Sequence, residues 1–371
     1  MRFGKITVPL MLALLVALSF SVIAFGQTQP IFLWGEGRPM FTTIASDPTV
    51  NVTAGAMPSW TGSFKFGEKT YPFTMIGTDP AAGSQSTVVP TEIIPIRFVF
   101  GEGNSLDPTA PVCGGTKSAV QLVLDSPVFQ SSTFTPGGTD VGTTQYVDAF
   151  QRANFWDKVS TTSPGYHVLL GAPVVMPLQT IVVPKSFGSI GNGPCARVGK
   201  VSMAFFYAWL IQHVQNISST SFPIFLTYNT FFTQNGSCCI LGFHTAFGLA
   251  PNGLTVGVAA YSDAGIFNVP IQDIHALSHE VGEWMDDPFG TNFAPRWNGG
   301  QVSGCSFQLE VGDPVTGKAF QVTINGTTYN PEDLVFLSWF ARQTPSTAVS
   351  GLYTFLNNYS EPPAVCRESG S

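Results

Sequence analysis

The chain has 371 residues, of which 11% are charged, against about a quarter in typical soluble proteins. The formal net charge is −7 and lysine and arginine form no cluster, so nucleic acid is not expected as a partner. Phe, Gly and Pro are abundant, which is typical of a chain rich in strands and turns.

The chain begins with the pattern of an export signal. Arg2 and Lys5 precede an almost wholly apolar run over residues 6–25, and small residues end this run at Gly26. We therefore predict a signal peptide over residues 1–26 and a mature protein that is secreted or extracytoplasmic. No second apolar run of this length occurs, so no membrane is expected as a partner after the signal is removed.

Six cysteines in an exported chain favour disulfides, and the even number fits three bridges. Adjacent Cys238 and Cys239 are expected not to pair with each other, because the ring that they would close is strained. No CxxC spacing occurs, which disfavours a cysteine-rich zinc site. The remaining cysteines are Cys113, Cys195, Cys305 and Cys366.

The first half of the mature chain, residues 27–185, is predicted to be β-rich. Short apolar or alternating runs at 93–100, 119–126 and 180–184 have the pattern of strands, with Gly, Pro, Ser and Thr between them. One helix is predicted in this region, over residues 144–156.

The second half, residues 186–371, has longer helical periods and holds four of the five histidines. Its first predicted element is a core helix over residues 196–217, because apolar residues recur there at helical spacing. The other predicted elements are strands at 222–228, 254–261, 306–311 and 319–324, a helix at 275–288, a Gly-rich connection at 298–304 and a helix from Pro331.

The segment His275–Pro288, HALSHEVGEWMDDP, carries the residues that point to chemistry. Residues four apart share one face of a helix, so His279 and Glu283 can reach one ion, with Glu280 beside them. The HExxH motif has this geometry: two side chains hold zinc and the intervening Glu is general base on the bound water. Here Glu283 replaces the second His, and a carboxylate is an acceptable zinc ligand. The sequence therefore predicts His279 and Glu283 as ligands and Glu280 as the base.

His275 lies two turns before Glu283 on the same helix. The two residues are about 12 Å apart along the axis at a rise of 1.5 Å per residue, so they cannot share an ion. His275 could instead pair with His279, or support the catalytic site as a transition-state group. We prefer the pair His279 and Glu283, because the alternative leaves Glu283 without a role.

A catalytic zinc needs a third protein ligand and an open position. The segment LEVGDP supplies Glu310, the first candidate, and Asp313, which fits a role in orienting a ligand by hydrogen bond. His244, in CCILGFHTAFG, competes as the third ligand. A second carboxylate would neutralise the zinc charge and leave the bound water less acidic, so a site with His244 would be the more potent catalyst.

The string SHEVGEWMDDPFG (residues 278–290) resembles the HExxE followed by DP or NP in bacterial secreted proteins related to the phosphate-induced, exordium-like family, which in turn resemble zinc metallopeptidases. The segments CCILGFHTAFG and LEVGDPVTGKAF are similar to the Cys, Gly, His segment and the acidic ExGD element of that family. The resemblance covers roughly residues 222–320. It implies an α+β protein in which a zincin-like mixed α/β half with an active-site-type helix follows the β-rich half. The site residues that it implies are His279, Glu280, Glu283, Asp287, Glu310 and Asp313.

These features lead to a first hypothesis and a rival. The first is a secreted zinc-dependent metallopeptidase-like hydrolase that acts on a peptide or cell-envelope substrate, with His275, Arg296 and Tyr329 as candidate oxyanion partners. The rival is a non-catalytic extracellular or cell-envelope binding protein, in which the same residues hold a structural metal ion or none. A serine hydrolase is disfavoured because no GxSxG motif occurs.

Overall fold

The structure, a computed structural model, describes residues 40–367 except 43, 51, 53–54 and 216. The predicted signal peptide lies outside the described residues. The protein is a mixed α+β structure rich in strands, as the sequence predicts. Among the described residues, no helix is long and apolar enough to cross a membrane.

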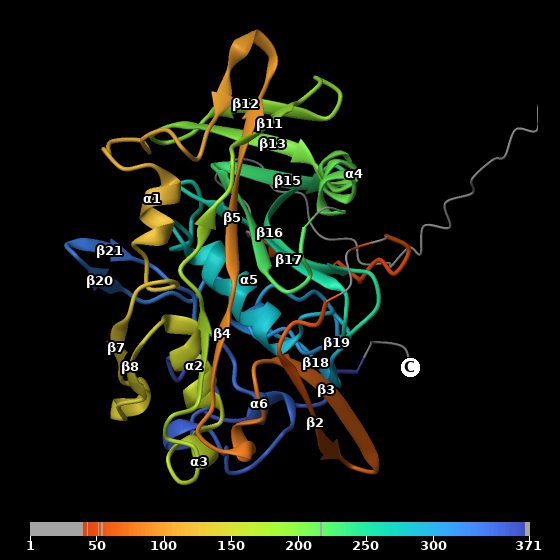
Figure 1. Ribbon diagram of the computed structural model, residues 1–371, viewed down its shortest axis with the longest axis vertical. Coiled ribbons are helices and arrows are strands. Elements are labelled where there is room, and N and C mark those ends of the chain that lie inside the picture. The colour runs from red at the N-terminus through yellow and green to blue at the C-terminus, as the bar shows by residue number, and fades with distance from the viewer. Residues whose placement is uncertain (1–39, 43, 51, 53–54, 216, 368–371) are drawn as a thin grey trace, which may run out of the picture.

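An eleven-stranded sheet organises the molecule (Figure 1). Its strands run in the order β10 (Val174–Val175), β5 (Thr91–Val99), β14 (Phe222–Tyr228), β17 (Leu254–Tyr261), β16 (Ser237–Phe247), β15 (Thr230–Gln234), β13 (Arg197–Ser202) and β12 (Gly188–Asn192). In addition, β1 (Met40–Phe41) pairs with β16, while β6 (Ser105–Leu106) and β11 (Gln179–Val182) pair with β5. Strands β5, β14 and β17 are parallel, and β14 and β17 are buried throughout, as expected for strands covered on both faces. The sheet thus takes strands from both predicted regions, 27–185 and 186–371.

Smaller elements surround this sheet. The helices are α1 (Ala119–Leu124), α2 (Tyr146–Asn154), α3 (Trp156–Val159), α4 (Met203–Val214), α5 (His275–Asp286) and α6 (Leu337–Phe340). The paired strands outside the sheet are β2 (Ser59–Phe66) with β3 (Lys69–Ile76), β4 (Ser86–Val89) with β9 (His167–Leu170), β7 (Ser132–Phe134) with β8 (Gly142–Thr144), β18 (Phe293–Trp297) with β19 (Ser306–Gln308), and β20 (Val322–Ile324) with β21 (Thr327–Tyr329). Short 3₁₀ turns are η1 (Pro80–Ala82), η2 (Gly101–Gly103), η3 (Pro136–Gly138), η4 (Asp313–Val315) and η5 (Val349–Gly351).

Helix α5 lies in the middle of the molecule and packs on β16 and β17 (Figure 1). All twelve of its residues are buried. Trp284 stacks on Phe222 of β14 with ring centroids 3.7 Å apart, and its Nε1 donates to Oγ1 of Thr255. Gly282 lets Leu334 approach the opposite side, since a Cβ at this position would lie 2.6 Å from Leu334 Cδ1. The helix is therefore fixed on several sides, which holds its polar side chains in place.

Several predicted elements are confirmed. Helices α2 and α3 follow the prediction over 144–156, and α5 the prediction over 275–288. Strands β14 and β17 cover 222–228 and 254–261 as predicted.

Three predicted elements are wrong. Residues 119–124 form helix α1 instead of a strand, because Ser118 and Gln121 make a reciprocal capping box that starts a helix. The predicted helix over 196–217 begins as strand β13, and α4 starts only at Met203. The predicted helix from Pro331 does not begin until Leu337, and α6 ends at Phe340 after four residues.

The expectation of three disulfides is confirmed, with bonds Cys113–Cys195, Cys238–Cys239 and Cys305–Cys366. The expectation that Cys238 and Cys239 do not pair is wrong. The peptide bond between them is cis and their Cα atoms are 3.0 Å apart, which brings the two side chains to the same side of the backbone.

Candidate metal centre

Both ends of α5 are fixed by aspartates. Before the helix, Oδ1 of Asp273 accepts from the backbone N–H groups of Ile274 and Asn330 at 2.6 and 2.9 Å. At its end, the carboxylate of Asp287 accepts from the backbone of Thr291 and Asn292, and Pro288 follows, which cannot donate a helical hydrogen bond. The sequence pattern therefore sets where the helix begins and ends, and with it the direction in which each acidic side chain points.

His279 faces Glu283 across one turn of α5, as the HExxE spacing predicts. Nδ1 of His279 lies 2.5 Å from Oε2 of Glu332, and a carboxylate there accepts the ring proton. Nε2 therefore presents a lone pair, 3.0 Å from Oε1 of Glu283 and 3.7 Å from Oδ1 of Asp313. Nε2 has no hydrogen-bond partner among the described residues. A ring whose outer nitrogen is held by a carboxylate is the usual arrangement of a metal-binding histidine.

Oε1 of Glu283 faces that lone pair and is an acceptor on its other side. It already accepts from the backbone N–H groups of Gly312 and Asp313, each at 3.2 Å. Two electron-rich atoms, Nε2 of His279 and Oε1 of Glu283, thus face each other at 3.0 Å. Atoms that share one tetrahedral zinc ion lie roughly 3.3 Å apart, for bonds of about 2 Å. The separation is close to this value and also to that of an N–H···O hydrogen bond, so either a divalent cation or a proton fits between the two atoms.

His244, on β16, approaches the other oxygen of Glu283. Its Nε2 donates to the carbonyl oxygen of Asp287 at 3.1 Å, so Nδ1 is the unprotonated nitrogen of the neutral ring. Nδ1 lies 3.3 Å from Oε2 of Glu280 and 3.7 Å from Oε2 of Glu283, while Nε2 lies 3.8 Å from Oε2 of Glu310. Burial and the nearby His279 lower the pKa of His244 to about 3, which keeps the ring neutral at physiological pH.

Glu283 is common to two groups of ligand-type side chains. It forms one group with His279 and Glu280 and the other with His244 and Glu310, and in each group the ligand atoms lie within 4.8 Å of one another. The first group is the predicted HExxE set. Neither group joins His279 to Glu310 or to His244, so the two predicted third ligands lie on the far side of Glu283 from His279.

Two glycines make room for these side chains. A Cβ at Gly242 of β16 would lie 2.7 Å from Cγ of Glu280, and a Cβ at Gly312 would lie 2.3 Å from Nδ1 of His279. Real Cβ atoms are not found that close, so any larger residue would displace the acid or the ring. The backbone of β16 and of the LEVGDP segment is thus shaped to the cluster.

The cluster is buried and acidic. Burial, together with Glu283, Asp313 and Glu332, raises the pKa of Glu280 well above its ordinary value, and burial raises the pKa of Glu283 to about 8. Among the described residues, Glu280, Glu283 and Glu332 form ion pairs with histidine rings and none with lysine or arginine. Buried carboxylates without basic partners need protons or a cation to balance their charge.

The structure separates the other two predicted site residues. Nε2 of His275 lies 3.1 Å from Oε1 of Glu332, so His275 packs behind His279 rather than beside Glu283. Asp313 stands next to His279, with its side chain 15% exposed, and its Oδ1 accepts from Nε2 of Gln301. Solvent reaches the cluster at Asp313, which makes this side of the site the open one.

Sequence reasoning missed three residues at the site: Glu332, Gln301 and Phe41. Glu332 was assigned to a helix, whereas it is extended and holds His279 and His275. The ring of Phe41 stacks on that of His279, with centroids 3.7 Å apart. No local pattern marks these contacts, because Phe41 and Gln301 are 260 residues apart and meet only in the folded chain.

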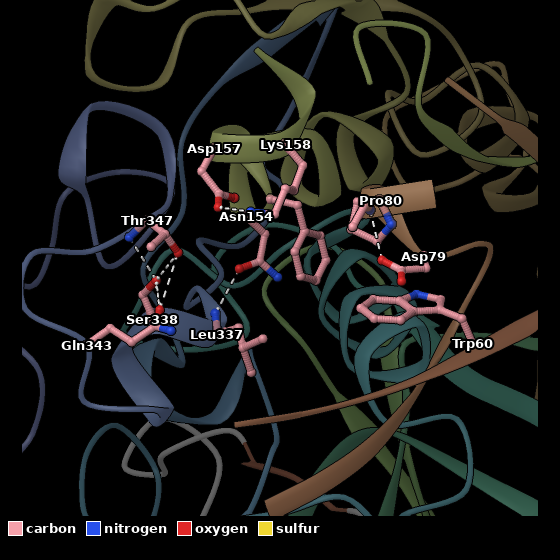
Figure 2. Close-up of a pocket in the computed structure, with 12 residues that line it drawn as sticks. Trp60, Asp79, Pro80, Asn154, Asp157, Lys158, Leu337, Ser338, Gln343 and Thr347 are labelled. Carbon is pink, nitrogen blue, oxygen red and sulfur yellow. Dashed lines mark hydrogen bonds and ion pairs between the residues drawn. The ribbon is translucent and has the colours of Figure 1, made fainter. Parts of the chain in front are cut away.

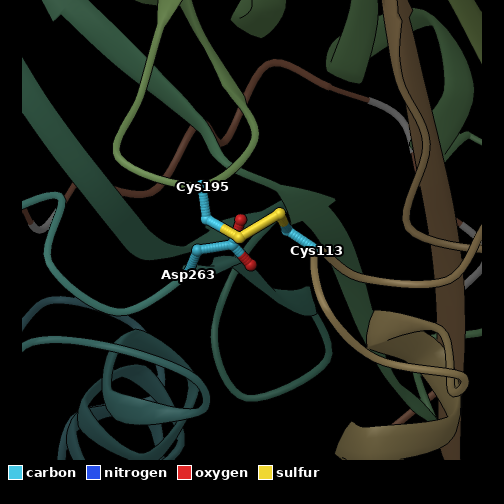
Figure 3. Close-up of side chains that lie close together, drawn as sticks. All are labelled: Cys113, Cys195 and Asp263. Carbon is cyan, nitrogen blue, oxygen red and sulfur yellow. A yellow bond between two sulfur atoms is a disulfide. The ribbon is translucent and has the colours of Figure 1, made fainter.

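A third close group, Cys113, Cys195 and Asp263, is not a metal site (Figure 3). The two cysteines form a disulfide, whereas the thiolate is the form of cysteine that binds metal. The carboxylate of Asp263 accepts hydrogen bonds from the side chains of Tyr228 and Asn229. This group therefore stabilises the loops that it joins.

An open pocket of about 220 Å³ lies near the carboxyl-terminal end of α5 (Figure 2). Trp60 and Asn154 line it, and Asn154 also contacts Asp286 at the end of the helix. Its polar side chains bond mainly to one another: Ser338 contacts Gln343 and Thr347, as the dashed lines in Figure 2 mark. No histidine lines the pocket, so it has no part in the metal-type cluster.

Comparison of the chain with known protein families, curated proteins and solved structures finds no match. The case for function therefore rests on the geometry of the cluster.

Proposed function

We propose that this chain is a secreted, zinc-dependent metallopeptidase-like hydrolase. The observation that carries the proposal is the pair of lone pairs 3.0 Å apart, on Nε2 of His279 and Oε1 of Glu283, in a buried site. Each of these atoms has its proton partners on the other side, which supports a cation between them. The predicted signal and the three disulfides support export. We also propose that α5 and the strands that it packs on form the zincin-like part of the chain.

The ligand set that we propose is His279, Glu283 and Asp313. Asp313 takes the third position in this proposal because its Oδ1 lies 3.7 Å from Nε2 of His279, whereas Glu310 lies beside His244. Asp313 belongs to neither close group, so its side chain would have to turn toward Glu283 when the ion binds. Histidine nitrogen and carboxylate oxygen both bind zinc, and the second carboxylate would leave the bound water less acidic than in a site with two histidines. The partial exposure of Asp313 provides the access that a catalytic site needs.

Glu280 is the general base in this proposal. A zinc ion, when bound, would supply a Lewis acid that polarises a carbonyl and acidifies water. Oε1 of Glu280 has no hydrogen-bond partner among the described residues, and burial raises the pKa of Glu280 well above its ordinary value, which makes it a stronger base than an exposed glutamate. Glu280 would take the proton of the attacking water and deliver it to the leaving amine.

His244 and Glu310 support the base from behind. Nδ1 of His244 contacts Oε2 of Glu280 at 3.3 Å, and its Nε2 is held by the carbonyl of Asp287. Because Nδ1 carries no proton, His244 would accept a hydrogen bond from Glu280 once Glu280 has taken up its proton, and so would act as a positioning residue. It is also the residue to which the ion would move if the second group, with Glu283 and Glu310, were the true site.

The rival function, a non-catalytic extracellular binding protein with a structural ion, is favoured by one observation. Phe41 covers the ring of His279 and is itself only 3% exposed, so the cluster is closed on this side. Structural zinc sites are closed in this way, whereas catalytic sites keep a position open.

Metal analysis of the purified protein tests the proposal. We expect one zinc per chain, lost in His279→Ala and kept in His244→Ala, with His213→Ala, an exposed histidine, as the matched control. Loss in His244→Ala and retention in His279→Ala would move the ion to the second group. Absence of stoichiometric metal in the wild-type chain would contradict the proposal.

Catalysis needs a separate test, because zinc can also be structural. We expect Glu280→Gln to keep its zinc and to lose at least a hundredfold of hydrolysis, measured on a mixed peptide library by mass spectrometry. Hydrolysis at the wild-type rate by a zinc-loaded Glu280→Gln variant would remove the catalytic role of Glu280. Absence of hydrolysis by the wild-type chain with zinc bound would favour the rival function.

A further inference from the structure

Residues 40–48, of which the structure describes all but residue 43, run along β16 beside the candidate metal centre. Strand β1 pairs in parallel with β16 at Ile240 and Gly242, and the contact continues as backbone hydrogen bonds. Ile44 donates to the carbonyl oxygen of His244, Asp47 donates to that of Ala246, and Gly248 donates to that of Asp47. The other edge of β16 belongs to β17, and β15 pairs with β16 only as far as Ile240. The segment thus fills an edge of β16 that no other described strand takes.

One side chain of the cluster region holds the backbone of this segment. The amide of Gln301 accepts from the N–H of Phe41 at 2.7 Å and donates to its carbonyl oxygen at 3.0 Å. The same amide donates to Asp313, the open side of the centre. A contact of this kind holds an extended peptide by its main chain and does not depend on its side chains.

The side chain of Phe41 completes the contact. Its ring stacks on His279 at 3.7 Å and lies 6.2 Å from the ring of His275. An extended strand, a main-chain clamp and an apolar side chain over a metal-type histidine together make up the elements of peptide recognition by strand addition. They join a segment near residue 40 to residues about 200 to 260 positions later, so the segment behaves as a ligand carried by its own chain.

We propose that the edge of β16, Gln301 and the ring of His279 form a binding groove for an extended peptide with a large apolar side chain, and that residues 40–48 occupy this groove in the intact chain. The inference names the substrate class of the proposed centre and therefore rests on the proposed function. A substrate must displace residues 40–48 before it reaches Glu280, so the segment limits access to the centre.

The test uses the full chain and a fluorescent peptide with the sequence of residues 36–48. Phe41→Ala in the protein weakens the internal segment and leaves the groove intact, so we expect the peptide to bind at least tenfold more tightly than to the wild type. Adding Gln301→Ala to Phe41→Ala removes the side chain that holds the peptide backbone, so this double variant should bind the peptide no more tightly than the wild type. Adding Gln234→Ala to Phe41→Ala changes an exposed glutamine instead, so this matched control should keep the tighter binding. Fluorescence anisotropy measures all four proteins.

The result that would overturn the groove is a folded Phe41→Ala variant that binds the peptide no better than the wild type, or a double variant that binds as well as the single one. A second measurement needs no variant: excess peptide should speed hydrogen exchange at the amides of Ile44 and Asp47 in the wild-type chain, and unchanged exchange would contradict the proposal. Both experiments are run with and without zinc. A chain that binds the peptide but takes up no stoichiometric zinc would contradict the hydrolase and leave the groove, whereas a chain that takes up zinc but binds no peptide would do the reverse.

Discussion

Helix α5 buries two sets of acidic side chains in different surroundings: Asp286 and Asp287 at its carboxyl-terminal end, and Glu280 and Glu283 one to two turns earlier. At the carboxyl-terminal end, Asp286 accepts from the side-chain amide of Gln151 at 2.6 Å, and Asp287 accepts from two backbone N–H groups. One turn before Asp286, Glu283 faces the unprotonated nitrogens of His279 and His244. Burial raises the pKa of Glu283 as well as the pKa values of Asp286 and Asp287, so burial alone does not distinguish the two sets.

The difference lies in what each carboxylate faces. A buried carboxylate that accepts hydrogen bonds from amides is satisfied by the protein itself. One that faces imidazole lone pairs is satisfied only when a proton or a cation enters between them. The aspartates at the end of the helix are therefore structural, whereas Glu280 and Glu283, together with His279 and His244, form the candidate site for an ion.

Metal removal should give the largest effect, and it should act on the glutamates of α5 but not on the aspartates at its end. We expect dialysis against a chelator to lower the free energy of unfolding by about 4 kcal/mol at zinc concentrations a thousandfold above the dissociation constant. Hydrogen exchange should increase around His279 and Glu283 and change little around Asp287. Equal increases in hydrogen exchange around Glu283 and around Asp287, measured by mass spectrometry, would show that the two sets of acids do not differ.

Substitution of one glutamate and one aspartate of α5 compares the two sets of acids directly. Glu283→Gln removes the carboxylate shared by both groups, so we expect zinc affinity to fall by more than about a hundredfold, beyond what loss of an outer partner costs. Asp286→Asn should keep the zinc and lose stability, because its amide no longer matches Gln151. Competition with a zinc-binding dye measures the affinity, and thermal unfolding measures the stability. A zinc-loaded Glu283→Gln variant would contradict the assignment of the shared ligand.

The response to pH should have opposite signs with and without zinc. The folded metal-free chain holds a proton on Glu283, whose pKa is raised to about 8, while the unfolded chain releases it near the ordinary value of 4.5. The folded state therefore binds more protons over this range, and its stability from this group falls as pH rises from 4.5 to 8. Zinc must displace that proton, so its affinity should rise about tenfold per pH unit for each proton released. Calorimetry in buffers of different ionisation enthalpy counts the protons, and a count of zero would exclude Glu283 as a ligand.

The sequence predicted the centre of the site because its signals are local. Helical spacing placed His279, Glu280 and Glu283 on one helix, and the scarcity of charge in the chain marked the segment. Strands such as 222–228 and 254–261 were predicted for the same reason, since an apolar run between turn residues is a local pattern.

The sequence did not predict what the folded chain brings from a distance. Glu332 holds His279 from 53 residues away, and Phe41 and Gln301 meet across 260 residues. At Ser118 a local signal was present but was outweighed by the apolar run after it, although Ser followed three residues later by Gln starts a helix. Partners at long range depend on the order of strands in the sheet, which spacing along the chain does not encode.

The smallest expected effect comes from a variant that changes only the surroundings of Asp286, at the carboxyl-terminal end of α5. Gln151→Ala removes the amide that donates to Oδ2 of Asp286 and leaves only Asn154, whose amide is 3.4 Å from Oδ1. We expect a loss of about 1 kcal/mol in the free energy of unfolding, because one buried acceptor loses its donor while water can enter from the pocket beside Asn154. Zinc content should not change, since among the described residues Gln151 makes no side-chain hydrogen bond to a member of the two metal-type groups. Loss of zinc in this variant would mean that the aspartates and the glutamates of α5 form one cooperative site rather than a structural set and a metal-binding set.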